Sequence, residues 1–304
     1  MDDRLRRLLP SVPPGLINRA GSAYLAGPAL ADAVERARRL TGRGDAVGIA
    51  YWHGDGDTAV VVAAEIRAAI EALSGLDART AVAVKAPGLD FDGGLLRDIA
   101  RAAASTGVAL TFDAHSPADA DGTLQAAASA REVGATVGVA LPARWRRSTE
   151  DARWAMAQGL GIRLIKGQWA DVGDRLSVTP ESVLRRSYLA LVDEVAGGSS
   201  RISVATHDGT LLDAAVTRLR AAGTSCDVEL LVGFPHRRCL AVARQHRVDV
   251  RWYVAYGHPS LAYPLPSVLC RPRLARSLIQ GVALGRLNQL LRMRDLAGGP
   301  ERSA

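Results

Sequence analysis

Short apolar runs alternate with longer amphipathic stretches along most of this chain. The apolar runs number eight and span residues 46–52, 81–85, 108–113, 136–141, 162–166, 202–206, 228–232 and 248–254. Stretches with helical spacing separate them, at about 58–74, 93–106, 121–133, 148–158, 179–196, 209–222 and 236–246, and a longer one covers about 266–294. Such alternation is typical of a parallel sheet that is buried on both faces.

Eight strand–helix units within about 250 residues predict a closed (β/α)8 barrel. An open doubly wound sheet is the alternative, and it would more typically carry a Gly-x-Gly-x-x-Gly turn after its first strand. Here the first run is followed by His53-Gly54-Asp55-Gly56-Asp57, which is a different turn. We expect a helical N-terminal arm at 1–40, a barrel domain at 41–296 and a disordered tail at 297–304.

The composition is that of a soluble globular protein, with 23% charged and 48% hydrophobic residues. No apolar run approaches the roughly 20 residues that span a bilayer, so we expect no stable membrane insertion. The first residues lack an apolar signal core, which predicts a cytoplasmic protein. The spacing of the cysteines and histidines fits neither a metal site nor a disulfide framework, so we expect no metal.

The net charge of +7 raises the question of an anionic partner. The arginines are scattered through the helical stretches, and aromatic residues make up only 5% of the chain. This pattern favours solvated arginines on helix faces, and we expect no nucleic-acid partner. Peripheral attraction to an anionic membrane surface stays open.

Lysine is rare here, and both lysines occupy similar places. Of the 38 basic residues only Lys85 and Lys166 are lysines, and each closes a short apolar run. In an α/β barrel the carboxyl ends of the strands carry the functional site. A lysine ammonium is a compact charge that can approach a phosphate, a carboxylate or a flavin edge. We therefore expect both lysines to act in a site.

Other polar side chains also fall at predicted strand ends. With the two lysines, the set comprises Asp113, Arg163, Thr206, His207, Asp208, Glu229, Tyr253 and Tyr256. Structural alternatives exist: Asp113 as a helix cap, Arg163 and Asp208 in rim ion pairs, and His207 bonded to a loop carbonyl. So many charges at one rim are costly to bury without a ligand, which predicts a binding site there.

The fifth run ends in a pattern suited to a pyrophosphate. Arg163 and Lys166 supply two positive charges on one strand, and Gly167 follows them. A glycine lets a ligand approach the backbone closely. We expect these three residues to bind a phosphate-bearing cofactor.

Four segments together resemble the proline dehydrogenase family, of the FAD-dependent PutA type. Residues 163–169, Arg-Leu-Ile-Lys-Gly-Gln-Trp, resemble the family's Arg-Leu-Val-Lys-Gly-Ala-Tyr strand, and residues 205–208, Ala-Thr-His-Asp, resemble its Ala-Thr-His-Asn/Asp segment. Residues 229–234, Glu-Leu-Leu-Val-Gly-Phe, are similar to Gln-x-Leu-x-Gly-Met. Residues 250–257, Val-Arg-Trp-Tyr-Val-Ala-Tyr-Gly, are similar to Val-Arg-x-Tyr-Val-Pro-Tyr-Gly.

The resemblance implies a distorted (β/α)8 barrel that holds FAD. It implies that Arg163 and Lys166 contact the FAD phosphates and the isoalloxazine side. By the same resemblance, Thr206 and His207 would hold the adenine half, and Trp169 would take the place of a tyrosine near the flavin.

On the substrate side, the resemblance implies catalytic roles for four residues. Lys85 and Asp113 would lie beside the flavin and the substrate, and Tyr253 and Tyr263 would line the substrate pocket. Glu229 joins the cofactor-binding set. The implied activity is oxidation of proline, or of a proline-like cyclic or secondary amine, to an imine, with a quinone or oxygen as the electron acceptor.

One departure bears on the substrate. The family's last helix begins with Tyr-x-x-Arg-Arg, whose arginines hold the proline carboxylate, whereas residues 263–267 here read Tyr-Pro-Leu-Pro-Ser. The nearest arginines are Arg271 and Arg273, which flank Pro272. An arginine fork is the preferred partner of a carboxylate, so we expect free proline to be a poor substrate.

This departure points to an amine with a masked carboxylate, including a modified or carrier-tethered prolyl group. Two other functions stay open at this stage. One is a degenerate flavin- or ligand-binding barrel without dehydrogenase activity, and the other is a phosphate-ligand barrel enzyme that uses no flavin.

Overall fold

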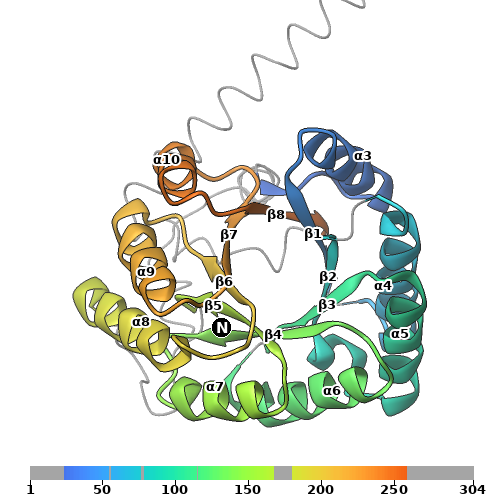
Figure 1. Ribbon diagram of the computed structural model, residues 1–304. Helices are drawn as coiled ribbons and strands as arrows, with labels where there is room; N and C mark the ends of the chain where they lie inside the picture. The colour runs from blue at the N-terminus through green and yellow to red at the C-terminus, as the bar shows by residue number, and fades with distance from the viewer. Residues whose placement is uncertain (1–23, 55, 77–78, 115, 168–179, 259–304) are drawn as a thin grey trace, which may run out of the picture.

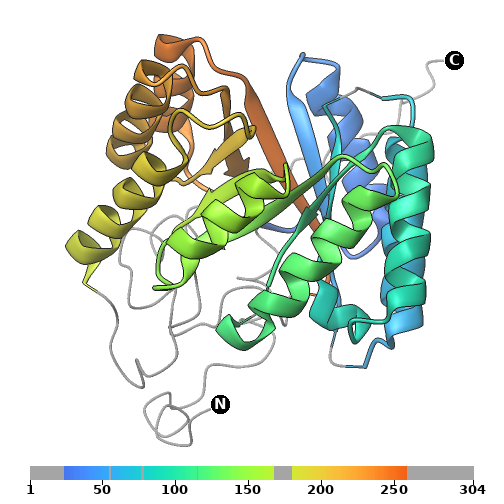
Figure 2. The same cartoon turned by 60° about the horizontal axis from the view of Figure 1, so that its bottom comes forward.

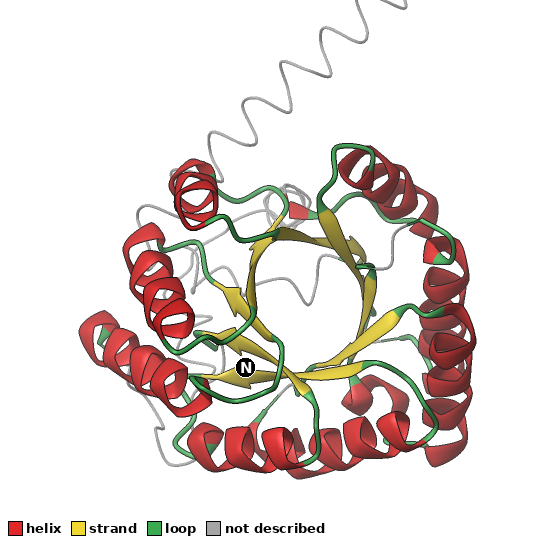
Figure 3. Cartoon of the chain, viewed as in Figure 1, coloured by secondary structure: helices red, strands yellow, loops and turns green. Residues whose placement is uncertain are grey.

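The protein is a closed barrel of eight parallel strands surrounded by helices (Figures 1 and 3). This computed structural model describes residues 24–54, 56–76, 79–114, 116–167 and 180–258. The strands are β1 (Ala46–Trp52), β2 (Ala81–Val84), β3 (Ala109–Phe112), β4 (Val137–Pro142), β5 (Gly161–Ile165), β6 (Ile202–Ala205), β7 (Cys226–Leu231) and β8 (Val250–Gly257). Each pairs with the next, and β8 pairs with β1 to close the ring. The predicted (β/α)8 barrel is confirmed.

An outer ring of helices covers the strands, as Figure 2 shows from a second side. The helices are α3 (Leu30–Thr41), α4 (Ala59–Leu73), α5 (Gly93–Thr106), α6 (Ala120–Glu132), α7 (Ser148–Ala157), α8 (Glu181–Val195), α9 (Gly209–Ala221) and α10 (Arg237–His246), with short 3₁₀ turns η2 (Ala86–Leu89) and η3 (Pro117–Asp119). None of the described helices is long and apolar enough to cross a membrane.

The outward face of the strands forms the main core with these helices. Val47, Ile49, Val82 and Val84 belong to one buried cluster that extends through the helix layer. Asp92 illustrates how the helices begin, because its carboxylate accepts hydrogen bonds from the first backbone N–H groups of α5.

The inward face is asymmetric in side-chain size. On β1 to β4 the alternate positions that face the lumen are mostly small; they include Gly48, Ala50, Ala81, Ala83, Ala109, Gly138 and Ala140. The opposite strands contribute large polar groups to the same space; these are Arg163, Asp227, Glu229, Arg251 and Tyr253. Because side chains alternate along a strand, the small residues leave room for long charged ones to cross the barrel.

The chain before the barrel also contacts it. Leu25 forms a parallel bridge with Ala255 of β8, and α3 packs against β1 and β8. The domain boundaries expected at 40 and 296 stay a prediction. The helical stretch expected at 266–294 lies outside the described residues.

Candidate active site

Arg163 is the centre of the charged cluster inside the barrel. It projects from the middle of β5 and is 8% exposed. One terminal nitrogen, Nη2, donates to Asp113, and the other, Nη1, donates to Glu229 at 3.1 Å. Its guanidinium lies over the Tyr253 ring, 5.1 Å from the ring centre. Burial opposes the charged form, but Asp113 and Glu229 outweigh it and raise the pKa of Arg163.

The carboxylates of this cluster come from strands on either side of β5. Asp113 follows β3 directly, and Glu229 lies within β7. Asp113 therefore binds Arg163 and does not cap the next helix. Burial raises the pKa of the Glu229 carboxyl, and the neighbouring Arg163 and Arg251 oppose the rise. The guanidinium hydrogen bond holds this carboxyl as an acceptor.

Lys85 lies at the same mouth, one residue past β2. Its Nζ donates to the backbone oxygen of Tyr51 at 3.1 Å and lies 5.8 Å from the centre of the Trp52 ring. Burial lowers the pKa of Lys85 to about 8; Asp113 opposes this shift and Arg163 adds to it. A lysine in this state exchanges its proton near neutral pH, as catalytic lysines do.

Lys166 lies at the rim, one residue past β5. Its ammonium pairs with Glu181 of α8 and with Asp208, whose Oδ2 is 3.2 Å away. Asp208 also caps α9 through the backbone N–H of Leu211. The rim ion pair considered for Asp208 from the sequence is therefore present, and Lys166 takes part in it.

Gly167 is required by the local packing. Its φ of +85° lies in the left-handed region. A Cβ atom at this position would approach Cβ of Pro142 to 2.7 Å. The close approach that the sequence predicted for a ligand is here made by the β4 end, so glycine is needed even without a ligand.

The β6 end holds Thr206 and His207 by local hydrogen bonds. His207 accepts from the backbone N–H of Leu231 through Nε2, at 3.0 Å, and its Nδ1 lies 3.0 Å from the oxygen of Pro235. These contacts fix a neutral ring, and burial lowers its pKa to about 4. The Thr206 hydroxyl accepts from the N–H of Asp208. A ligand would reach His207 through the ring face or edge, since both nitrogens are engaged.

A second polar layer lies beneath the first. Asp227 is 1% exposed and pairs with Arg201 at 2.9 Å and Arg251 at 3.4 Å. Ser203 donates to the same carboxylate. This layer lies toward the amino ends of the strands, and polar residues at that end of an α/β barrel usually stabilise the fold.

Side chains alternate between the two faces of each strand, and this alternation decides which aromatic residues lie in the lumen. Trp52 shares the lumen face with Lys85 and donates through Nε1 to the Tyr253 hydroxyl at 3.5 Å. Tyr256, which was grouped with Tyr253, lies three positions further and turns to the outer core, where its hydroxyl binds Glu65. That grouping was wrong, because an odd spacing in a strand reverses the face.

The predicted site residues fall into two groups in space. Lys85, Asp113, Arg163, Glu229 and Tyr253 meet inside the mouth of the barrel, and we call them the mouth cluster. The second group comprises Lys166, Gly167, Thr206 and His207, at the rim of β5 and β6. Trp169 and Tyr263 lie outside the described residues.

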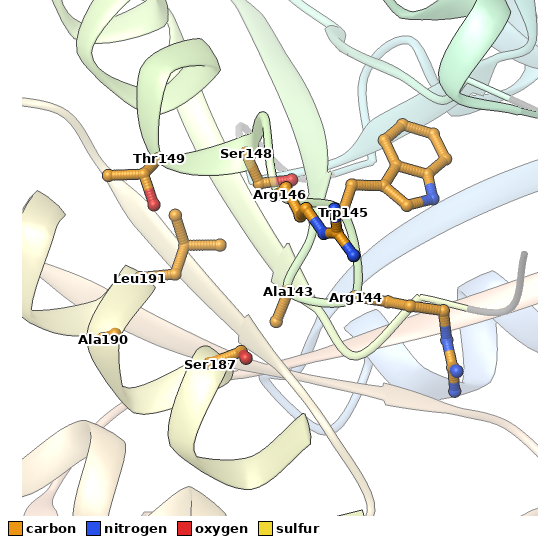
Figure 4. A pocket seen from close by; sticks show the side chains of 9 residues that line it. All are labelled: Ala143, Arg144, Trp145, Arg146, Ser148, Thr149, Ser187, Ala190 and Leu191. Atoms are coloured by element: carbon orange, nitrogen blue, oxygen red, sulfur yellow. The ribbon is translucent and has the colours of Figure 1, made fainter. Parts of the chain in front are cut away.

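Surface pockets lie elsewhere. One of about 180 Å³ lies between the β4–α7 connection and α8; Figure 4 shows Ser187 and Leu191 of α8 on one side of it and the segment from Ala143 to Thr149 on the other. Another, of about 380 Å³, includes Cys226 and Asp249 near the amino ends of the strands. Neither contains a member of the mouth cluster. Across the described residues, no group of three or more potential ligands could hold a metal ion.

Solved structures with a similar fold include several PutA proteins. No family model and no curated protein matches the chain. Among solved structures, proline utilization A (PutA) from Bdellovibrio bacteriovorus, inactivated by N-propargylglycine, has a TM-score of 0.70 and 15% identity over 86% of this chain and 32% of that chain. PutA from Corynebacterium freiburgense has a TM-score of 0.64 and 17% identity over 93% of this chain and 34% of that chain.

A mutant PutA of Bradyrhizobium japonicum is similar at a TM-score of 0.64 and 17% identity, over 86% of this chain and 31% of that chain. The chain thus spans about a third of the length of each PutA protein. At these identities the likeness concerns the fold. This chain has the barrel fold that occurs within PutA proteins, and its charged mouth cluster extends from the middle of β5, β7 and β8 to the carboxyl ends of β2 and β3.

Proposed function

We propose that this protein is an FAD-dependent oxidoreductase of the proline dehydrogenase type, which oxidises proline or a proline-like cyclic or secondary amine to an imine. The observation that carries the proposal is the buried mouth cluster in a barrel with the PutA fold. Burial of four charged side chains is costly without a ligand, and this end of an α/β barrel is where sites occur.

FAD is compatible with the polar groups that remain available. The Nε atom of Arg163 is buried and lacks a hydrogen-bond partner among the described residues, so it is a donor in need of an acceptor. Lys166 uses its ammonium on two carboxylates and has three N–H donors, which leaves one for a phosphate oxygen. Because both terminal nitrogens of Arg163 are taken by carboxylates, Lys166 is the better phosphate ligand of the two.

The protein's chemical task is to hold the amine and manage its proton. A bound flavin supplies the acceptor for a hydride equivalent from the carbon beside the amine nitrogen. That carbon gives up hydride only from the neutral amine. Lys85, with a pKa lowered to about 8, is suited to take a proton from an incoming ammonium. Trp52 and Tyr253 form the apolar walls beside it.

The proposed substrate class rests on the sequence at residues 263–267. The resemblance places two carboxylate-binding arginines where this chain has Pro266 and Ser267. An amine with a masked carboxylate, such as a modified or carrier-tethered prolyl group, therefore fits better than free proline. We propose a quinone or oxygen as electron acceptor.

The first test is the flavin content of the purified protein. A yellow preparation with bound FAD agrees with the proposal and excludes a phosphate-ligand barrel that uses no flavin. A protein that neither retains FAD nor binds it on reconstitution contradicts the proposal. The degenerate flavin-binding barrel predicts a yellow protein whose flavin no amine reduces.

A further inference from the structure

The terminal nitrogens of Arg163 are both occupied by carboxylates of this chain. Asp113 accepts from Nη2 and Glu229 accepts from Nη1 at 3.1 Å, and all three residues are at most 9% exposed. The fork of an arginine is the group that proteins use to bind a ligand carboxylate in two-point fashion. Here the two terminal nitrogens already bind two carboxylates of the same chain.

The charges of the mouth cluster also balance. It contains two cations, Lys85 and Arg163, and two anions, Asp113 and Glu229. An anion that enters this balanced space meets no net positive charge that would offset its loss of hydration. Without the Glu229 charge, the lumen would have an excess positive charge next to the mouth.

Glu229 is a buried anion of the mouth cluster, and its carboxylate accepts from Arg163 Nη1 at 3.1 Å. A glutamine has the same shape and can accept a hydrogen bond from Arg163, but it does not neutralise the guanidinium.

We propose that Glu229 is a specificity-determining residue, which acts as an internal counter-ion on Arg163 and excludes ligands with a free carboxylate from the barrel mouth. The ligands that remain are amines without a free carboxylate. This inference rests on the proposed amine-oxidising function for the choice of amines, and it does not depend on turnover.

The test compares two ring compounds of the same size and opposite charge. Pyrrolidine is a cation at neutral pH, and cyclopentanecarboxylate is an anion. Binding of each is measured by anaerobic calorimetry to the protein with its bound flavin reduced beforehand, so that pyrrolidine cannot be oxidised, for the wild type, for Glu229→Gln and for Glu194→Gln. Glu194 is a matched control because it pairs with Arg153 on the outer helix surface.

The wild type should bind pyrrolidine more tightly than cyclopentanecarboxylate. Glu229→Gln should gain affinity for the carboxylate by about tenfold or more, since it removes one of the two negative charges beside the Arg163 guanidinium, and should lose affinity for pyrrolidine. Glu194→Gln should behave as the wild type.

The proposal is overturned if Glu229→Gln leaves both affinities unchanged, or if neither compound binds to either protein. If Glu229→Gln fails to fold, the wild type still decides, because equal or tighter binding of the carboxylate contradicts the proposal. Failure of the amine-oxidising function would be seen separately, as an oxidised flavin that amines do not reduce, with the charge preference intact.

Discussion

Lys166 and Lys85 are central to the proposed function, Lys166 as a phosphate ligand and Lys85 as a proton acceptor. Their shared place, one residue past a strand, follows from the apolar runs that each closes. The partners of each lysine do not follow from those runs, because Glu181, Asp208 and the Tyr51 backbone come from other elements. Sequence reasoning found these two positions but not the pairs that hold them.

Replacing Lys166 with alanine should lower FAD occupancy. The variant loses a charge-assisted hydrogen bond to phosphate, worth about 1.5–3 kcal/mol, so FAD should bind tenfold or more weakly. Fluorescence titration of the apoprotein with FAD measures this. Arg153→Ala, which removes a surface ion pair, is the control. A Lys166 variant that binds FAD as tightly as the wild type would refute the phosphate role.

Lys85 should give the stability a distinct pH dependence. Its pKa is about 8 in the folded protein and 10.5 in the unfolded chain, so between these values the unfolded state binds more protons. The free energy of unfolding should therefore rise with pH from about 8 to 10.5, by on the order of 3 kcal/mol. Urea denaturation across this range measures the rise.

Lys85→Met removes the titrating group and should flatten this rise. If the wild type and Lys85→Met show the same pH dependence of unfolding, Lys85 is charged in the folded state throughout the range, and its role as proton acceptor is wrong.

At the level of single elements, the connection after β5 is the most constrained part of the site. Gly167 combines a φ of +85° with a Cβ position only 2.7 Å from Pro142. Gly167→Ala should destabilise the protein by about 2–4 kcal/mol, from backbone strain plus the clash. Gly134→Ala, where φ is +93° and no atom lies within 4 Å, should cost only about 1 kcal/mol.

Urea unfolding of the two glycine variants provides the comparison. Equal losses of stability would mean that the contact with Pro142 relaxes without cost, and that Gly167 is not needed for the packing of the β5 end.

The elements were largely predictable because each strand is a mainly apolar run. The run at 46–52 coincides with β1, and the predicted segment at 93–106 coincides with α5. The face that each residue takes required the alternation along the strand as well. Alternation assigns Trp52 to the lumen and Tyr256 to the outer core. Tyr256 was expected in the site because it lies near a strand end, and Trp52 was not expected there.

On the scale of the whole molecule, the lumen is organised by charges that come from distant parts of the sequence. Arg163 and Glu229 are 66 positions apart, and Arg163 and Asp113 are 50 apart. A single sequence shows the candidates but not their partners, because barrel closure and strand register decide which side chains meet. In our proposal, the ion pairs of Arg163 with Asp113 and Glu229 decide whether the barrel mouth binds or excludes an anionic ligand.

The most direct test of the central claim is anaerobic reduction of the FAD-loaded protein by amines, followed by the loss of flavin absorbance. Pyrrolidine or L-prolinamide should bleach the flavin, and Lys85→Met should keep its flavin but bleach far more slowly. Free L-proline should be less efficient by about a hundredfold or more, from two missing charged hydrogen bonds. A flavin that stays oxidised with every cyclic and secondary amine would contradict the account, and fastest reduction by free L-proline would contradict its substrate assignment.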